Sequence, residues 1–143
     1  MRRLQIVLDT NVLVAALRSN LGAAFLLLSL IGQSEKFDIN LSVPLVMEYE
    51  DVTLRDGLLP KMSRAAIVDV LDYLCIVGTQ KDIFFLWRPF LKDPKDDMVL
   101  ELAVEAQCDY IVTFNQKDFV GVEQFGIQAL TPYQFLQKIG ELP

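Results

Sequence analysis

Residues 4–11 read LQIVLDTN, and this short stretch sets the fold class of the chain. Its first five residues are mostly apolar, as expected of a buried strand in the middle of a parallel sheet. The run stops at Asp9, Thr10 and Asn11, residue types that favour turns and helix N-caps. We therefore predict a strand over residues 4–8 that is followed at once by a helix over residues 12–17.

The rest of the chain repeats this alternation of short apolar runs and helical segments. Apolar spacing, capping residues and helix-initiating prolines predict strands at 37–41, 110–113 and 127–130, helices at 23–34, 45–55, 63–74, 96–107 and 132–139, and an extended segment at 83–90. Such alternation indicates an α/β fold in which helices cover both faces of a mostly parallel sheet. We expect a three-layer α/β/α architecture with a sheet of four to five strands, in a single domain over residues 1–143.

Composition narrows the possible chemistry. The chain has 143 residues, 52% of them hydrophobic, which predicts a globular domain with a sizeable core. It has no histidine, so Ser-His-Asp triads and His-ligated zinc or iron sites are excluded. Cys75 and Cys108 lie among apolar neighbours, and we expect both to be buried, reduced thiols. The longest apolar run near the N-terminus is too short for a bilayer and no signal-peptide pattern occurs, so we expect a cytoplasmic protein with no membrane partner.

Polar side chains follow the predicted strands at the points where they end. Asp9 follows the first strand, Glu48 lies early in the helix after the second, and Asp97 opens the helix before the third. Asn115 and Asp118 follow that third strand. Sites in parallel sheets form beyond the carboxyl ends of the strands, so we expect these residues to converge. Several carboxylates at one edge repel one another, and oxygen ligands favour a hard divalent cation, Mg²⁺ or Mn²⁺.

Helical spacing alone does not identify the ligands within two acidic clusters. Glu48, Glu50 and Asp51 share one short predicted helix, where a solvated acidic face is an equally good interpretation. Asp96 and Asp97 both lie at a helix start, where the helix dipole alone favours either carboxylate. The residues by themselves leave both choices open.

Three motifs resemble the PIN-domain family, and in particular the branch that contains toxin components of toxin–antitoxin systems. They are IVLDTNV at 6–12, LSVPLVMEY at 41–49, and the block from DPKDD at 93–97 to IVTFNQKDF at 111–119. The last is the most specific, because the distance from Asp97 to the strand-end Thr113 and to the N-x-x-D-F ending reproduces the family spacing. The resemblance covers nearly the whole chain and implies a single PIN domain with metal-dependent ribonuclease activity.

The resemblance also assigns roles to individual residues. It selects Glu48 among the acids of its helix, and Asp97 over Asp96. The fourth ligand is shared between Asp118 and Asn115, because many family members have an aspartate where this chain has Asn115. Resemblance thus implies metal binding and catalysis by Asp9, Glu48, Asp97 and Asp118, with Asn115 as a further metal ligand, and support from Thr10, Asn11, Ser42, Asp96 and Thr113.

A ribonuclease of this type would hydrolyse a phosphodiester by in-line attack of metal-activated water, which requires no histidine. The net charge of −6 argues against RNA binding, but bound divalent ions would reverse the local charge at the site. The implied partners are an RNA substrate and a cognate antitoxin protein. The aromatic group Phe84, Phe85, Trp87 and Phe90 favours a homodimer contact, with base stacking as the alternative.

Three other functions compete with this interpretation. Haloacid-dehalogenase-type phosphatases also open on a strand followed by Asp-Thr, but they need a second aspartate where this chain has Asn11. Receiver domains expect a phospho-acceptor aspartate near mid-chain and a later lysine, and this sequence does not match them. The third alternative is a catalytically weak or inactive PIN-fold module that binds RNA or another protein.

Overall fold

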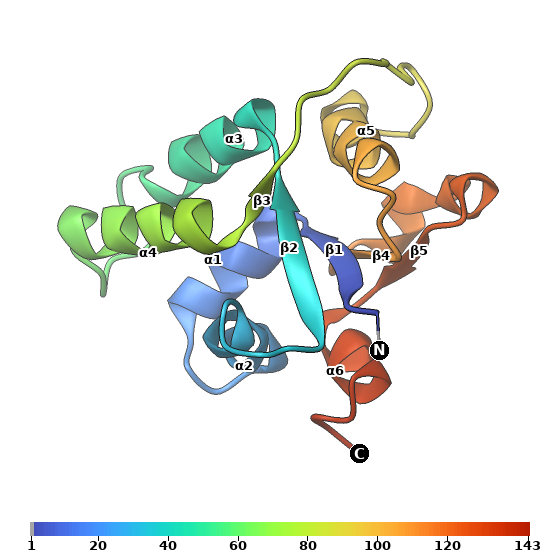
Figure 1. Ribbon diagram of the computed structural model, residues 1–143. Coiled ribbons are helices and arrows are strands. Elements are labelled where there is room, and N and C mark those ends of the chain that lie inside the picture. Colours follow the sequence, from blue (N-terminus) through green and yellow to red (C-terminus); the bar gives the residue numbers. More distant parts are fainter. Residues whose placement is uncertain (1) are drawn as a thin grey trace.

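The computed structural model describes residues 2–143 and has the expected α/β architecture, with a parallel sheet at its centre (Figure 1). The sheet has five strands, all parallel, in the order β3-β2-β1-β4-β5. They are β1 (Leu4–Leu8), β2 (Phe37–Leu41), β3 (Thr79–Gln80), β4 (Tyr110–Val112) and β5 (Gln128–Leu130). Ile6 of β1 is level with Ile39 of β2 and with Tyr110 of β4. The carboxyl ends of these three strands therefore lie along one edge of the sheet.

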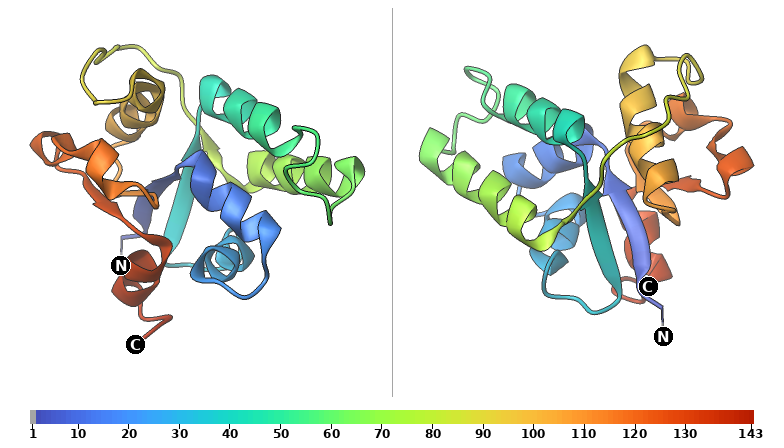
Figure 2. Two further views of the ribbon diagram at one scale, coloured as in Figure 1. Left: turned by 180° about the vertical axis from the view of Figure 1, so that it is seen from behind. Right: turned by 45° about the horizontal axis from the view of Figure 1, so that its top comes forward.

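Helices cover both faces of this sheet, as the three-layer prediction requires. They are α1 (Thr10–Arg18), α2 (Ala23–Leu30), α3 (Val43–Thr53), α4 (Arg64–Val77), α5 (Asp97–Glu105) and α6 (Pro132–Lys138), with short 3₁₀ helices η1 (Pro94–Asp96), η2 (Gln116–Phe119) and η3 (Val122–Phe125). Helix α5 packs against β1, β2 and β4, whereas α2 contacts α1 and α6. Seen from behind, α1 lies in front of the sheet and α5 beyond it (Figure 2). No single helix within residues 2–143 is long and apolar enough to cross a membrane, although α1 and α2 reach that length as a pair bent by 101°.

The central strands are apolar because they are covered on both faces. Ile6 and Val7 of β1 and Ile111 of β4 are completely buried. Each such side chain contributes about 1.5–3 kcal/mol relative to exposure. This rigid sheet fixes the positions of the residues that follow each strand.

Two local predictions are corrected by the structure. Helix α2 ends at Leu30 rather than at residue 34, because Gly32 has a φ of 78° and takes the chain out of the helix. Cys75 is exposed, and the prediction of a buried thiol is wrong. It lies on α4, which buries Ile67, Leu71 and Leu74, and so belongs to a different face of that helix. Cys108 is buried, as predicted.

Strand β3 was absent from the sequence-based expectation. It has only two residues, both exposed, and pairs with the end of β2. Residues 83–90, predicted to be extended, contain no regular secondary structure. This segment nevertheless links β3 to the start of α5, beside the carboxyl edge of the sheet (Figure 1).

Candidate active site

Asp9 is fixed between the end of β1 and the end of β4. It is the N-cap of α1, and its Oδ1 accepts a hydrogen bond of 2.9 Å from the backbone N–H of Thr10. Its other carboxylate oxygen accepts a hydrogen bond of 2.7 Å from the hydroxyl of Thr113. The carboxylate is buried, and its orientation is therefore set by two elements that are adjacent in the sheet.

Thr113 connects the supporting residues at this edge. Besides donating to Asp9, its hydroxyl oxygen accepts a bond of 3.0 Å from the backbone N–H of Asn115 and a longer one of 3.5 Å from the side-chain amide of Asn11. The Asn11 carbonyl oxygen in turn accepts from the backbone N–H of Phe114 at 3.4 Å. Asn11 thus joins the start of α1 to the chain that leaves β4.

Glu48 reaches the same edge from α3. Ser42 is the N-cap of this helix and accepts a hydrogen bond of 3.3 Å from the N–H of Leu45, so Ser42 positions the helix rather than a carboxylate. One oxygen of Glu48 accepts a hydrogen bond from the hydroxyl of Thr10. Its acidic neighbours do not share this environment.

Those neighbours, Glu50 and Asp51, are both exposed, and Asp51 forms an ion pair of 3.0 Å with Arg55. The choice that helical spacing left open therefore has a geometric answer. Among the acids of α3, Glu48 is the one that lies beside Thr10 and faces the end of β1.

Tyr49 is a positioning residue that the sequence did not reveal. Its buried hydroxyl donates a hydrogen bond of 2.6 Å to the carbonyl of Leu8. Leu8 directly precedes Asp9, and Tyr49 directly follows Glu48, so this bond ties the two acidic positions together. Burial, and then the charges of Asp9 and Glu48, raise the pKa of Tyr49 well above its ordinary value, which keeps the hydroxyl protonated as a donor. A tyrosine next to a candidate acid on a buried helix was the only available signal.

Asp97 contacts the loop that precedes α5. It is completely buried, and its Oδ1 accepts hydrogen bonds from the backbone N–H groups of Leu91 at 2.9 Å and Phe90 at 3.3 Å. Its Oδ2 is buried and has no hydrogen-bond partner among residues 2–143. These contacts give Asp97 a clear structural function, which is to fix the chain before α5.

Asp96, which the spacing argument ranked behind Asp97, is the acid that lies in the electric field of the others. Burial and, after it, the negative charge of Asp9 raise the pKa of Asp96 to about 7. Asp93, Asp118 and Glu48 add to the shift. The structure thus brings Asp96, rather than Asp97, together with Asp9 and Glu48. The two aspartates are adjacent and both start a helical turn, so a one-residue difference in alignment decides which of them is assigned to the site.

Asp118 and Asn115 lie in one turn but differ in burial and in their effect on the other acids. Asp118 lies on η2 and is half-buried, and its charge raises the pKa of both Asp9 and Asp96. Asn115 is exposed, and its backbone carbonyl accepts a hydrogen bond of 2.9 Å from the N–H of Asp118. Asn115 therefore stabilises the turn through its backbone, whereas the side chain of Asp118 adds negative charge near Asp9 and Asp96.

Within residues 2–143, these acids form no ion pair with a basic side chain, since none of the five ion pairs there includes Asp9, Glu48, Asp96 or Asp118. Burial raises the pKa of Asp9 in spite of two hydrogen bonds that oppose the shift, and Glu48 and Asp118 raise it further. In the described part of the chain, no three acidic side chains already lie close enough to form a metal cluster. The donors are all oxygens, and their mutual repulsion would be relieved by a hard divalent cation, so the residues fit Mg²⁺ or Mn²⁺.

The structure is a parallel α/β domain with acidic side chains at the carboxyl edge of its sheet, an arrangement that several classes of phosphate-processing protein share. A model of the PIN domain family matches residues 5–117, and the chain therefore belongs to the PIN-domain family. No curated protein matches the chain. PIN domains are generally nucleases that use divalent metals. The matched region contains Asp9, Glu48, Asp96 and Asp97 and ends one residue before Asp118.

Proposed function

We propose that this chain is a Mg²⁺- or Mn²⁺-dependent endoribonuclease. The observation that carries the proposal is the set of neighbouring carboxylates at the carboxyl edge of the sheet, where burial and, after it, the charges of the other acids raise the pKa of Asp9 and bring that of Asp96 to about 7. Carboxylates that repel one another in this way are typical of sites built for a cation. Membership of the PIN-domain family supports a nuclease as the function of such a site.

We assign the metal to Asp9, Glu48 and Asp96, with Asp118 as the fourth acid. A bound ion of this kind would supply an activated water and would offset the charge that develops on the phosphate. The chain itself orients the ligands, because Thr113 holds Asp9 and Thr10 holds Glu48. The place of an acid in many family members is taken here by the exposed amide of Asn115, so we propose one resident ion, with a second that joins only with RNA.

The motif resemblance supports a more specific role. We propose that the chain acts in the cytoplasm as the toxin component of a prokaryotic toxin–antitoxin system, that a cognate antitoxin protein binds it, and that it forms a homodimer. A small open reading frame beside the gene is expected to encode this antitoxin. The product should co-purify with the chain and suppress its ribonuclease activity, and sedimentation should give twice the mass of one chain. An adjacent product that binds but leaves cleavage unchanged would contradict the toxin role.

A second candidate is a PIN-fold module that binds RNA or protein with little or no catalysis. The observation in its favour is that the acids do not form a ready-made metal cluster within residues 2–143. Cleavage of single-stranded and structured RNA in Mg²⁺, Mn²⁺ or EDTA separates the two candidates. Absence of metal-dependent cleavage, or cleavage that survives Asp9→Asn, would favour the binding module.

Helix α3 offers a matched pair of variants for this experiment. Glu48→Gln removes the carboxylate that accepts from Thr10, whereas Glu50→Gln removes an exposed carboxylate two residues away on the same helix. We expect Glu48→Gln to lower kcat by at least about a hundredfold, as loss of a group that stabilises transition-state charge does, and Glu50→Gln to change it little. Equal losses in both variants would show that net negative charge, not a site, is being measured.

A further inference from the structure

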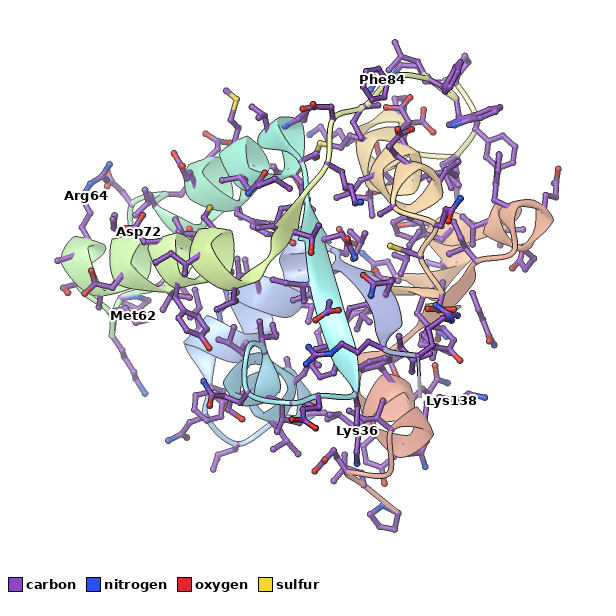
Figure 3. All side chains as sticks on the ribbon, in the orientation of Figure 1. Lys36, Met62, Arg64, Asp72, Phe84 and Lys138 are labelled. Carbon is purple, nitrogen blue, oxygen red and sulfur yellow. The ribbon has the colours of Figure 1, made fainter. Side chains whose placement is uncertain are left out.

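Residues 83–90, IFFLWRPF, form an exposed segment that we call the aromatic strap. It links β3 to η1 without regular secondary structure. Phe84 is 73% exposed and Phe85 is 67% exposed, and Phe84 lies at the outer rim of the molecule (Figure 3). Exposed neighbouring aromatic rings of this kind commonly mark a surface that binds a partner.

The strap is held in place through its backbone and its last rings. Buried Glu101 accepts a hydrogen bond of 2.8 Å from the backbone N–H of Trp87 and forms an ion pair with Arg88. The rings of Trp87 and Phe90 pack edge-on against Phe125, with centroids 5.2 Å and 5.3 Å away. The strap is therefore anchored at its second half, while Phe84 and Phe85 project from the first.

The position of the strap relates it to the candidate active site. The chain just before the strap is held at the carboxyl edge of the sheet, where the N–H of Lys81 donates a hydrogen bond of 2.8 Å to the carbonyl of Leu41. From there the chain crosses between α3 and α5, as both views show (Figure 2). Residues 91–93 connect the end of the strap to η1, whose last residue is Asp96. The N–H of Phe90, the last residue of the strap, donates a hydrogen bond of 3.3 Å to Asp97, which directly follows Asp96, so the end of the strap lies close to the acids.

The charge of this part of the chain differs in sign from that of the whole. Residues 81–95 contain four basic and two acidic residues, in a protein whose net charge is −6. Lys92 and Lys95 are exposed, and neither belongs to an ion pair within residues 2–143. Aromatic rings interleaved with cations are the surface that binds single-stranded nucleic acid, because rings stack on bases and cations bind phosphates.

We propose that the aromatic strap is a surface on which this chain binds RNA beside the active site, by stacking its exposed rings on unpaired bases. This inference rests on the proposed ribonuclease function. A duplex hides the faces of its bases, so Phe84 and Phe85 can stack only on an unpaired strand. The strap thereby binds the unpaired RNA, and cleavage takes place at the acids.

Trp87 provides a direct probe, because it is the only tryptophan of the chain and lies in the strap. The experiment titrates the full chain with an unpaired oligoadenylate and with a perfect RNA duplex of the same length. It follows Trp87 fluorescence and, independently, polarisation of labelled RNA. Ca²⁺ is present to neutralise the carboxylates, and a gel monitors the integrity of the RNA. The test variant is Phe84→Ser with Phe85→Ser. The control variant is Leu21→Ser with Phe25→Ser, which removes two apolar side chains near the far end of α1 from Asp9.

We expect oligoadenylate to quench the fluorescence of Trp87 and the duplex to bind at least about tenfold more weakly than oligoadenylate. Because stacking contributes strongly per base, the strap variant should lose at least about tenfold in affinity for oligoadenylate. The control variant should bind as wild type does. Equal affinities of the wild type and the strap variant for oligoadenylate would refute the inference. So would a change from dimer to monomer in the strap variant with RNA binding unchanged, because the strap would then be a protein interface. Failure of the proposed ribonuclease function would give a different result, in which RNA binds to the strap but no metal-dependent cleavage occurs.

Discussion

Alanine replacements of Asp96 and Asp97 are expected to have opposite effects, although the two residues are adjacent. Asp97→Ala removes an acceptor of two backbone hydrogen bonds and leaves the buried N–H of Leu91 without a partner. Hydrogen bonds to a charged group contribute about 1.5–3 kcal/mol each, and the longer bond to Phe90 contributes least, so we expect a loss of about 3 kcal/mol. For a chain of this size that lowers Tm by about 10 °C.

Asp96→Ala should leave the metal-free protein as stable as before or slightly more stable. The variant removes a carboxylate whose pKa is raised to about 7 by burial and by its acidic neighbours. Because Asp96 is partly exposed, solvent screening limits the gain to no more than about 1 kcal/mol. The expected loss lies in metal binding and in cleavage of RNA.

Thermal unfolding with and without Mg²⁺ measures both effects. A ligand at about a hundred times its Kd stabilises a protein by about 2.7 kcal/mol, which is a shift of about 8 °C here. We expect Mg²⁺ to raise the Tm in this way in wild type and in Asp97→Ala, whose metal-free Tm is lower. We expect no such rise in Asp96→Ala. The assignment of Asp96 to the metal is refuted if Asp97→Ala loses the Mg²⁺ shift at an unchanged metal-free Tm while Asp96→Ala keeps it.

Two further predictions concern the framework of the sheet. Tyr49→Phe leaves the Leu8 carbonyl without its buried donor. We therefore expect urea unfolding to show a loss of about 1–2 kcal/mol in the free energy of unfolding, together with weaker stabilisation by Mg²⁺. An unchanged Mg²⁺ titration would show that the hydroxyl does not position the site. Burial works to raise the pKa of Asp109, but the hydrogen bonds from Arg2 and from the N–H of Gln5 outweigh it and lower that pKa. A lowered carboxyl pKa stabilises the fold above the unfolded value of about 4, and this stability is lost as pH falls through the lower folded pKa. Because solvent screens this largely exposed pair, we expect wild type to exceed Asp109→Asn by less than about 1 kcal/mol at pH 7 and to lose that advantage progressively below pH about 4. A pH-independent difference would contradict this linkage.

The sequence was most informative where one residue type had one physical role. The run at β1 and its abrupt end at Asp9 predicted a buried strand and a helix cap, and both are present. Ser42 and Ser63 predicted helix starts, and each caps its helix. Such local signals sufficed for all six α-helices and for four of the five strands, but not for the three short 3₁₀ helices among residues 2–143. Strand β3 escaped because two exposed residues carry no apolar pattern, and only their pairing with β2 defines them.

The acids were less predictable because a carboxylate has the same local preferences in a metal site, at a helix start and in a buried anchor. Asp96 and Asp97 differ by one position, yet one lies in the field of the other acids and the other binds backbone N–H groups. Glu101 lies one turn beyond Asp97, a spacing that is equally compatible with support of Asp97 and with a solvated side chain, and the structure shows that it is buried. Its partners come from residues 87 and 88, and no periodicity within α5 could reveal a contact with another segment.

Helix α5 therefore connects two parts of the proposed function. Asp97 and Glu101 are four residues apart, on one face of the helix, and both accept hydrogen bonds from the end of the aromatic strap or the residue after it. Asp96, directly before that helix, belongs to the candidate active site. The hydrogen bonds that Glu101 accepts all come from the strap, so a change at Glu101 should move the strap while leaving the acids in place. We expect Glu101→Gln, which weakens the ion pair with Arg88, to raise KM for unpaired RNA more than it lowers kcat. An effect on kcat alone would mean that Glu101 supports the acids and that the strap is positioned by other contacts.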